Sequence, residues 1–165
     1  MQRVDGQHDH LWRLIEDISI GMLVTHDGEG DHLRARPMGA RCKADENAIY
    51  FLTSVESGKD EEVESNHNVC VAFADSKGQK YVSVTGSASV SNDRARIREL
   101  WTTLDGAWFK NADDPAIRLL RVEPSHGEYW DSPGSIVSFV KMSFAAVTGA
   151  KVHTGENKKV DLGGR

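Results

Sequence analysis

Two arginines and a lysine are the residues of this sequence whose types and spacing best suit a chemical task. Arg34 and Arg36 are separated by one residue, so on a strand both side chains point to the same face. Lys59 follows Ser57 and Gly58 at the predicted start of a helix, where free backbone N–H groups also attract anions. Guanidinium and ammonium groups bind phosphate through charge-assisted hydrogen bonds. We therefore expect these residues to converge on one phosphorylated ligand.

Each of these patterns also has a simpler explanation. Exposed arginines on an edge strand are common, and Pro37, which cannot donate to a ladder, favours such an edge directly after Arg36. The segment 57–59 also looks like the end of a nucleotide-binding P-loop, but that motif requires a glycine where this chain has Thr53. The combination of the arginines with the Pro37-Met38 step and with the downstream lysine favours phosphate binding over both alternatives.

Other site chemistry has little support in the sequence. His26 and His32 flank a predicted hairpin, but no further ligand stands at a spacing that would complete a metal site, so we expect no bound metal. The chain has no G-x-S-x-G motif, which argues against hydrolase chemistry. Cys42 and Cys70 have no paired framework, and we expect both to be small, buried and unreactive in a reducing cytoplasm.

Length and composition indicate one ordinary globular domain over residues 1–165. The chain is 39% hydrophobic and 27% charged, with a net charge of −5. A negative balance argues against non-specific nucleic-acid binding. No apolar run approaches the ~20 residues that a membrane helix needs, and no signal-peptide core is seen, so we expect a cytoplasmic protein.

The hydrophobic pattern predicts a mainly β fold with a few flanking helices. Short strands separated by evenly spaced turns favour a small closed or partly open barrel over a doubly wound parallel sheet. Gly86, in the middle of the most regular alternation, predicts a bulge. The predicted strands are Ile20–Thr25, Asp31–Ala40, Ala48–Thr53, Asn68–Ala74, Tyr81–Val90, Ala116–Glu123 and Gly127–Asp131. The predicted helices are His8–Ser19, Lys59–Asn66, a helix capped by Asp93 that runs to Trp101, and Ser135–Thr148.

Several segments together resemble a known family. These are the run 34–38 (RARPM), the strand 49–53, the segment 57–59 (SGK), and the later segments 81–86, 108–109 and 127–130. In order and spacing they resemble the pyridoxamine 5′-phosphate oxidase-like FMN-binding split barrels, and within these the general stress protein 26 group. The resemblance implies a six-stranded Greek-key split barrel with its core at about 11–148. It also implies a homodimer that binds FMN at the subunit interface. The last helix adds an apolar stripe that needs cover, and the polar tail 151–165 is expected to be disordered or docked on a partner.

The resemblance also implies a role for each site residue. Arg36 and Lys59 would hold the FMN phosphate, helped by Arg34 and by the loop residues Ser57 and Gly58. The remaining residues would line the flavin: Pro37 and Met38 along the ring or ribityl chain, Leu52 and Thr53 at the ring, Tyr81 beside it, and Trp130 from the second subunit.

The chain departs from the oxidase itself at three places. Gly58 stands where the oxidase has an arginine, Arg41 replaces a lysine, and the C-terminal arginine and histidine of the oxidase have no counterpart. Oxidation of pyridoxamine 5′-phosphate is therefore not expected. The resemblance implies an FMN-dependent oxidoreductase instead. The alternatives are a non-catalytic flavin sensor or carrier in stress response, or a split barrel that binds a deazaflavin or haem.

Overall fold

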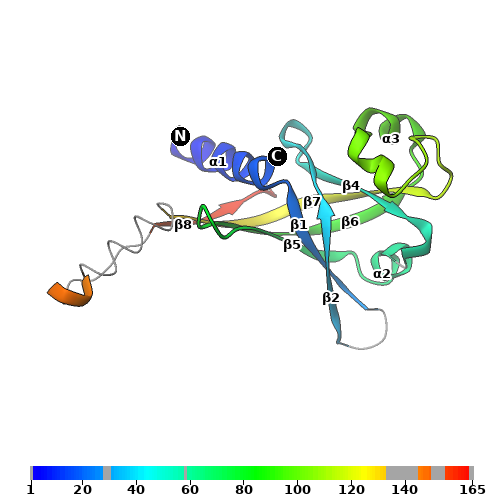
Figure 1. Ribbon diagram of the computed structural model, residues 1–165. Coiled ribbons are helices and arrows are strands. Elements are labelled where there is room, and N and C mark those ends of the chain that lie inside the picture. The colour runs from blue at the N-terminus through cyan, green and yellow to red at the C-terminus, as the bar shows by residue number, and fades with distance from the viewer. Residues whose placement is uncertain (1, 28–30, 58, 133–144, 150–154, 164–165) are drawn as a thin grey trace.

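A single antiparallel sheet organises the computed structural model, which describes residues 2–27, 31–57, 59–132, 145–149 and 155–163. Within these residues the sheet has eight strands in the order β2-β1-β5-β6-β7-β4-β3, with β8 paired to β7 (Figure 1). The strands are β1 (Ile20–His26), β2 (Leu33–Gly39), β3 (Arg41–Lys43), β4 (Ala48–Ser54), β5 (Asn68–Asp75), β6 (Lys80–Ser91), β7 (Ile117–Asp131) and β8 (Glu156–Asp161). The helices α1 (Gln2–Ile18), α2 (Lys59–Ser65) and α3 (Arg94–Leu100) lie around it.

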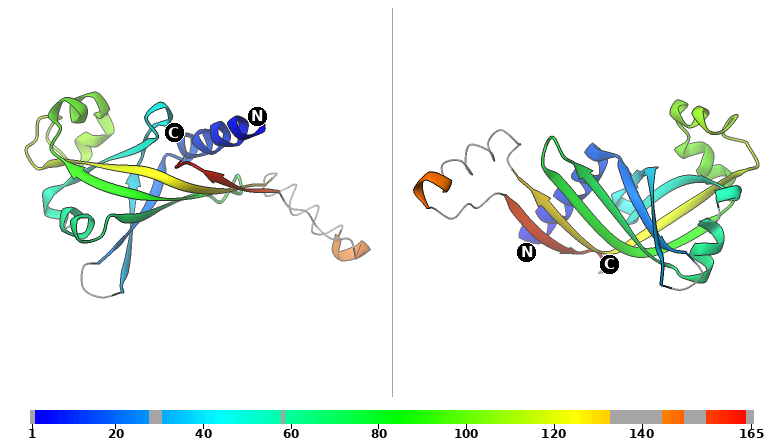
Figure 2. Two further views of the ribbon diagram at one scale, coloured as in Figure 1. Left: turned by 180° about the vertical axis from the view of Figure 1, so that it is seen from behind. Right: turned by 60° about the horizontal axis from the view of Figure 1, so that its bottom comes forward.

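The sheet is strongly curled. Its first and last strands, β2 and β3, are joined in the sequence by Ala40 alone, so the two ends of the strand order must approach each other. Figure 2 shows β2 crossing the longer strands rather than extending the sheet sideways. The result is an antiparallel half-barrel, which confirms the predicted mainly β fold. The six long strands β1, β2, β4, β5, β6 and β7 correspond to the predicted ones, whereas β3 and β8 were not expected.

The main core fills the inner face of this curl. It is built from alternate strand residues such as Leu23, Phe51 and Val84, each fully buried. Helix α1 adds Leu11 and Ile15 from its apolar stripe and lies across the half-barrel (Figure 1). The helix predicted from this spacing is therefore confirmed, although it begins earlier than expected.

A second, smaller cluster lies on the opposite face of β4. Tyr50 and Leu52 pack there against Ile97 and Leu100 of α3. Asp93 caps α3, since its side chain accepts a hydrogen bond from the backbone N–H of Arg96 at 3.0 Å. The predicted cap is therefore confirmed, and β4 is covered on both faces.

The sheet differs from prediction along β7. We expected two strands, 116–123 and 127–131, but one continuous strand spans Ile117–Asp131. The register shifts between Thr85 and Gly86, which confirms the bulge predicted at Gly86. A side chain at position 86 would collide with the backbone of Glu123, so only glycine allows this approach. The bulge accommodates Pro124 without interrupting the ladder.

The C-terminal tail was also predicted wrongly where the structure describes it. Residues 156–161 form β8, which pairs with the last part of β7 in the same chain. Val160 and Leu162 are buried in the main core, so this segment is an ordered part of the chain's own sheet and not a disordered tail. Of the predicted final helix, residues 145–148 are helical and 133–144 lie outside the described residues. Among the described helices, none is long and apolar enough to cross a membrane.

Candidate functional site

Arg34 and Arg36 lie on β2, at one end of the strand order, with both side chains on the inner face. Arg36 pairs in register with the buried Leu23, which fixes this orientation. Both guanidinium groups reach Glu62 of α2: Arg34 Nη1 donates to Oε1 at 2.7 Å, and Arg36 Nη2 donates to Oε2. The two arginines therefore meet at a carboxylate that was not among the predicted site residues, and their predicted convergence with Lys59 on a phosphate stays a prediction.

Thr25 of β1 completes this group of four residues, which we call the arginine cluster (Thr25, Arg34, Arg36 and Glu62). The Thr25 hydroxyl donates to Glu62 Oε2 at 2.5 Å and accepts from Arg36 Nη1 at 2.7 Å. Thr25 and Glu62 are buried, whereas the Arg34 side chain is 50% exposed. Within the described residues, Arg36 Nε makes no hydrogen bond, and Arg34 uses only Nη1.

The cluster carries a net positive charge. Burial raises the pKa of Glu62, but the hydrogen bonds from Thr25 and Arg36 and the positive charges of Arg36 and Arg34 outweigh burial, so the pKa lies below its usual value. Glu62 is therefore ionised at neutral pH. Two guanidinium groups and one carboxylate leave one net positive charge. Such a cluster, with N–H groups that no described residue uses, can bind an anion.

The loop between β4 and α2 supplies the other residues predicted to bind phosphate. Thr53 is buried on the inner face, and its hydroxyl lies 3.1 Å from the Ser57 hydroxyl. Ser57 donates in turn to the Ser54 carbonyl at 2.6 Å. Gly58 lies outside the described residues. Lys59 is the first residue of α2, one helical turn before Glu62, and its side chain is not described.

Only some of the residues predicted to line the flavin share the inner face with the arginine cluster, as Thr53 and Met38 do. Tyr81 and Trp130 are register partners on β6 and β7, and both are more than one third exposed on the outer face of the sheet. Pro37 also faces outward, opposite Met22. Met38 instead points inward beside the main core, and Leu52 packs towards α3. One protomer thus divides the predicted cofactor residues between two faces.

Arg41 is used differently from the arginines on β2. It extends from β3 to the segment after α3, where Nη2 pairs with the buried Asp105 and Nε donates to the Leu100 carbonyl at 3.3 Å. Nη1 donates to the Gly39 carbonyl at 2.8 Å. Asp105 also accepts from the Thr102 backbone N–H and hydroxyl at 2.8 and 2.9 Å. Arg41 therefore fixes this segment and does not join the arginine cluster.

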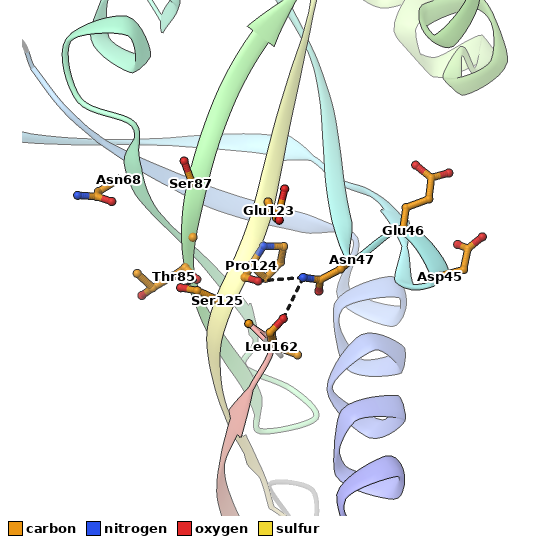
Figure 3. A pocket seen from close by; sticks show the side chains of 12 residues that line it. Asp45, Glu46, Asn47, Asn68, Thr85, Ser87, Glu123, Pro124, Ser125 and Leu162 are labelled. Atoms are coloured by element: carbon orange, nitrogen blue, oxygen red, sulfur yellow. Dashed lines mark hydrogen bonds between the residues drawn. The ribbon is translucent and has the colours of Figure 1, made fainter. Parts of the chain in front are cut away.

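A hollow of about 550 Å³ lies elsewhere, beside the bulge of β6 (Figure 3). Asn47 reaches across from the turn before β4 and donates to the carbonyls of Pro124 and Leu162 at 3.1 and 3.0 Å, as the dashed lines in Figure 3 show. None of the predicted site residues lines this hollow. Its hydrogen bonds join the turn, β7 and the end of β8, which gives them a structural role.

The described residues hold little that points to other chemistry. They contain no group of three or more His, Cys, Asp or Glu side chains that could bind a metal. Burial and the nearby charge of Glu16 raise the pKa of Cys42 to about 12, so this thiol stays protonated at neutral pH. The arginine cluster and the outer face are therefore the candidate regions for binding a ligand or a partner.

A curled antiparallel half-barrel with this strand order and with helices at its edges is a split barrel. A profile described as pyridoxamine 5′-phosphate oxidase like matches residues 6–153, so the chain belongs to this family. The predicted family and fold are thereby confirmed.

Individual relatives agree with this assignment. General stress protein 26 of Bacillus subtilis is 35% identical over 79 residues, which cover 46% of this chain and 56% of that protein. A solved structure of a candidate general stress protein 26 from Jannaschia sp. CCS1 superposes with a TM-score of 0.74 at 27% identity, over 95% of this chain and 98% of the other. A general stress FMN/FAD binding protein from Xanthomonas citri superposes with a TM-score of 0.66 at 28% identity, over 77% and 89%.

Proposed function

We propose that this protein binds FMN and acts as a flavin-dependent oxidoreductase, with the arginine cluster as its phosphate anchor. The observation that supports this most is the meeting of Arg34 and Arg36 at one point with a net positive charge and with N–H groups that have no partner among the described residues. This donor set suits a phosphate monoester, which carries close to two negative charges at neutral pH. The Xanthomonas citri relative described as FMN/FAD binding supports a flavin as the ligand.

The roles of the protein residues would be binding and orientation. A bound flavin supplies the hydride or electron transfer itself. Glu62 is ionised and holds three hydrogen-bond donors, so it is poorly suited to donate a proton. The arginine cluster thus has no proton donor, which also favours a second candidate, a flavin carrier or sensor without turnover.

We further propose that the site is completed in a homodimer. The outer face exposes a group of large apolar side chains, including Ile20 at 61% and Met22 at 40%. Tyr81 and Trp130 lie on this same face, whereas the arginine cluster lies on the inner face. A second copy that packs on the outer face would cover these apolar residues. The resemblance to the family implies that Trp130 of that copy would lie near the flavin.

The absorbance spectrum of the purified protein tests the ligand. A flavin gives paired bands in the near-ultraviolet and blue, a deazaflavin gives a single band, and haem gives a sharp Soret peak. Acid release followed by chromatography then separates FMN from FAD. Turnover with NADH or NADPH and oxygen distinguishes the oxidoreductase from the carrier. A colourless protein that takes up no added FMN would contradict the proposed function.

Met22→Glu tests the dimer, because it places a charge in the centre of the apolar outer face. We expect the dissociation constant of the dimer to rise at least about a hundredfold, since an unpaired charge is costly to bury in an interface. The matched control is Leu104→Glu, an equally apolar and more exposed residue beyond α3. Light scattering at micromolar concentration measures both. A monomeric wild-type protein, or equal dissociation of both variants, would contradict the interface.

A further inference from the structure

Glu62 is the residue through which the separate parts of the arginine cluster are joined. Its carboxylate receives one hydrogen bond from each of Thr25, Arg34 and Arg36. These three residues come from β1 and β2, whereas Glu62 comes from α2. The side chain is almost fully buried, with 8% exposed. The carboxylate therefore ties the edge of the sheet to the helix that begins with Lys59.

The contacts of Arg36 to the described residues use two of its three guanidinium nitrogens. Nη1 donates to Thr25 and Nη2 donates to Glu62, so the end of the guanidinium group is fixed by two neighbours that also bond to each other. Nε is not used by any described residue. An arginine side chain has several rotatable bonds, and holding it in one rotamer before the ligand arrives lowers the entropic cost of binding.

Two opposite effects on anion binding can follow from a carboxylate in this position. Its charge cancels part of the positive field, which weakens the attraction of an anion. Its hydrogen bonds also hold the guanidinium groups in place, which strengthens binding. Two features favour the strengthening of anion binding: Glu62 is almost fully buried, and Thr25 bonds to both Glu62 and Arg36. Without Glu62, Arg36, with only 14% of its side chain exposed, would lose its fixed rotamer.

We infer that Glu62 is a positioning residue for the phosphate site: it holds Arg36 and Arg34 in the orientation in which they bind the ligand phosphate. This inference rests on the proposed function, since it concerns the same site. It gives Glu62, a charged residue of α2, a role in ligand binding without any contact between Glu62 and the phosphate.

Glu62→Gln tests the inference, because it keeps the shape of the side chain and removes its charge. The variant raises the net charge of the cluster by one, so electrostatic attraction alone would make FMN bind more tightly. If Glu62 positions the arginines, FMN binds at least about tenfold more weakly, since both ion pairs are lost and the amide keeps only one acceptor oxygen for two arginines. The dissociation constant for riboflavin, which lacks the phosphate, changes less than about twofold. Titration calorimetry or quenching of flavin fluorescence measures both ligands.

Two further variants make the outcome decisive. Asp105→Asn is the matched control, because it removes the charge of a comparable buried carboxylate that bonds to Arg41. In this variant the ratio of the FMN and riboflavin dissociation constants is expected to stay unchanged. Thr25→Val removes only the hydroxyl between Arg36 and Glu62. It shifts the ratio in the same direction as Glu62→Gln but by less, and it serves as the test if Glu62→Gln fails to fold.

The possible results separate the inference from the proposed function. Tighter or unchanged FMN binding by Glu62→Gln, or an equal loss for FMN and riboflavin, overturns the positioning role while leaving FMN binding in place. A wild-type protein that binds neither ligand overturns both. Weaker binding of FMN alone, with the Asp105→Asn ratio unchanged, supports the inference.

Discussion

Two buried carboxylates, Glu62 and Asp105, each hold arginine side chains from the stretch that forms β2 and β3, yet the two sites differ in how completely they are used. At Asp105, the Thr102 backbone and hydroxyl and Arg41 take up the carboxylate, and all three nitrogens of Arg41 have protein partners. At Glu62, both arginines keep N–H groups without a described partner. A complete set of partners indicates a structural contact, whereas free donors beside a fixed carboxylate indicate a ligand site.

The largest effect is expected for Asp105→Asn, as a loss of stability. Breaking a buried ion pair leaves the other charge without compensation, and Arg41 is only 18% exposed. We expect the free energy of unfolding to fall by about 3 kcal/mol. Denaturant titration, followed by circular dichroism, measures it. A loss below about 1 kcal/mol would show that Arg41 finds other partners and that Asp105 is not the main support of the segment after α3.

Arg36→Ala and Arg41→Ala should separate ligand binding from stability. Arg36→Ala removes a fixed phosphate donor, so FMN binding weakens about ten- to a hundredfold. Arg41→Ala lowers stability, because it leaves Asp105 without its positive partner, but changes the FMN dissociation constant by less than about twofold. Fluorescence titration of FMN against both folded variants checks this. Equal losses of FMN affinity in the two variants would remove the distinction between the sites.

The sequence predicted the arginine pair because a strand repeats every two residues, and this period places Arg34 and Arg36 on one face whatever the rest of the fold does. It did not predict their partner. Four carboxylates, at positions 60, 61, 62 and 64, surround Val63, and only the packing of α2 against β1 and β6 selects the one that faces inward. Val63 itself is buried and marks that face of the helix. Val63 is thus the sequence signal that narrows the inward-facing carboxylate to one close to it on the helix surface.

The two segments of the fold that were predicted wrongly, β7 and β8, also depend on contacts between distant parts of the chain. The segment 124–126 was predicted to separate two strands, but β7 runs through it, because the bulge at Gly86 in the neighbouring strand accommodates the irregularity. In the tail, Val160 and Leu162 alternate within a polar segment, which is too short a pattern to show a strand on its own. The first outcome depends on the pairing of β7 with β6, and the second on the pairing of β8 with β7. Both pairings join segments that are distant in the sequence, so local patterns do not encode them.

A pH titration sharpens the comparison, because both carboxylates act in the same direction. Burial raises the pKa of Glu62 and of Asp105, but hydrogen bonds and arginine charges outweigh it and leave both below their ordinary values of 4.5 and 3.8. A group whose pKa is lowered by folding stabilises the protein above its unfolded pKa, and this stability is lost as the pH falls through the folded value. We expect no change from these groups between about pH 8 and 5, and a decline below about pH 4. Asp105→Asn should make the decline shallower. A wild-type decline that begins above pH 6 would point to other groups.

The smallest effect is expected for an ion pair that resembles the two sites in chemistry but not in burial. Arg98 Nε lies 2.6 Å from Asp113 Oδ1, and both side chains are more than half exposed. Water already solvates both charges, and ordering two long side chains offsets the attraction between them. Arg98→Ala should therefore change the free energy of unfolding by no more than about 0.5 kcal/mol, although its hydrogen bond is as short as that of Arg34 to Glu62. Thermal unfolding beside Asp105→Asn measures the contrast. If the two variants lost similar stability, burial would not be what separates the supporting ion pairs of this fold from its surface pairs, and the structural role assigned to Asp105 would lose its physical basis.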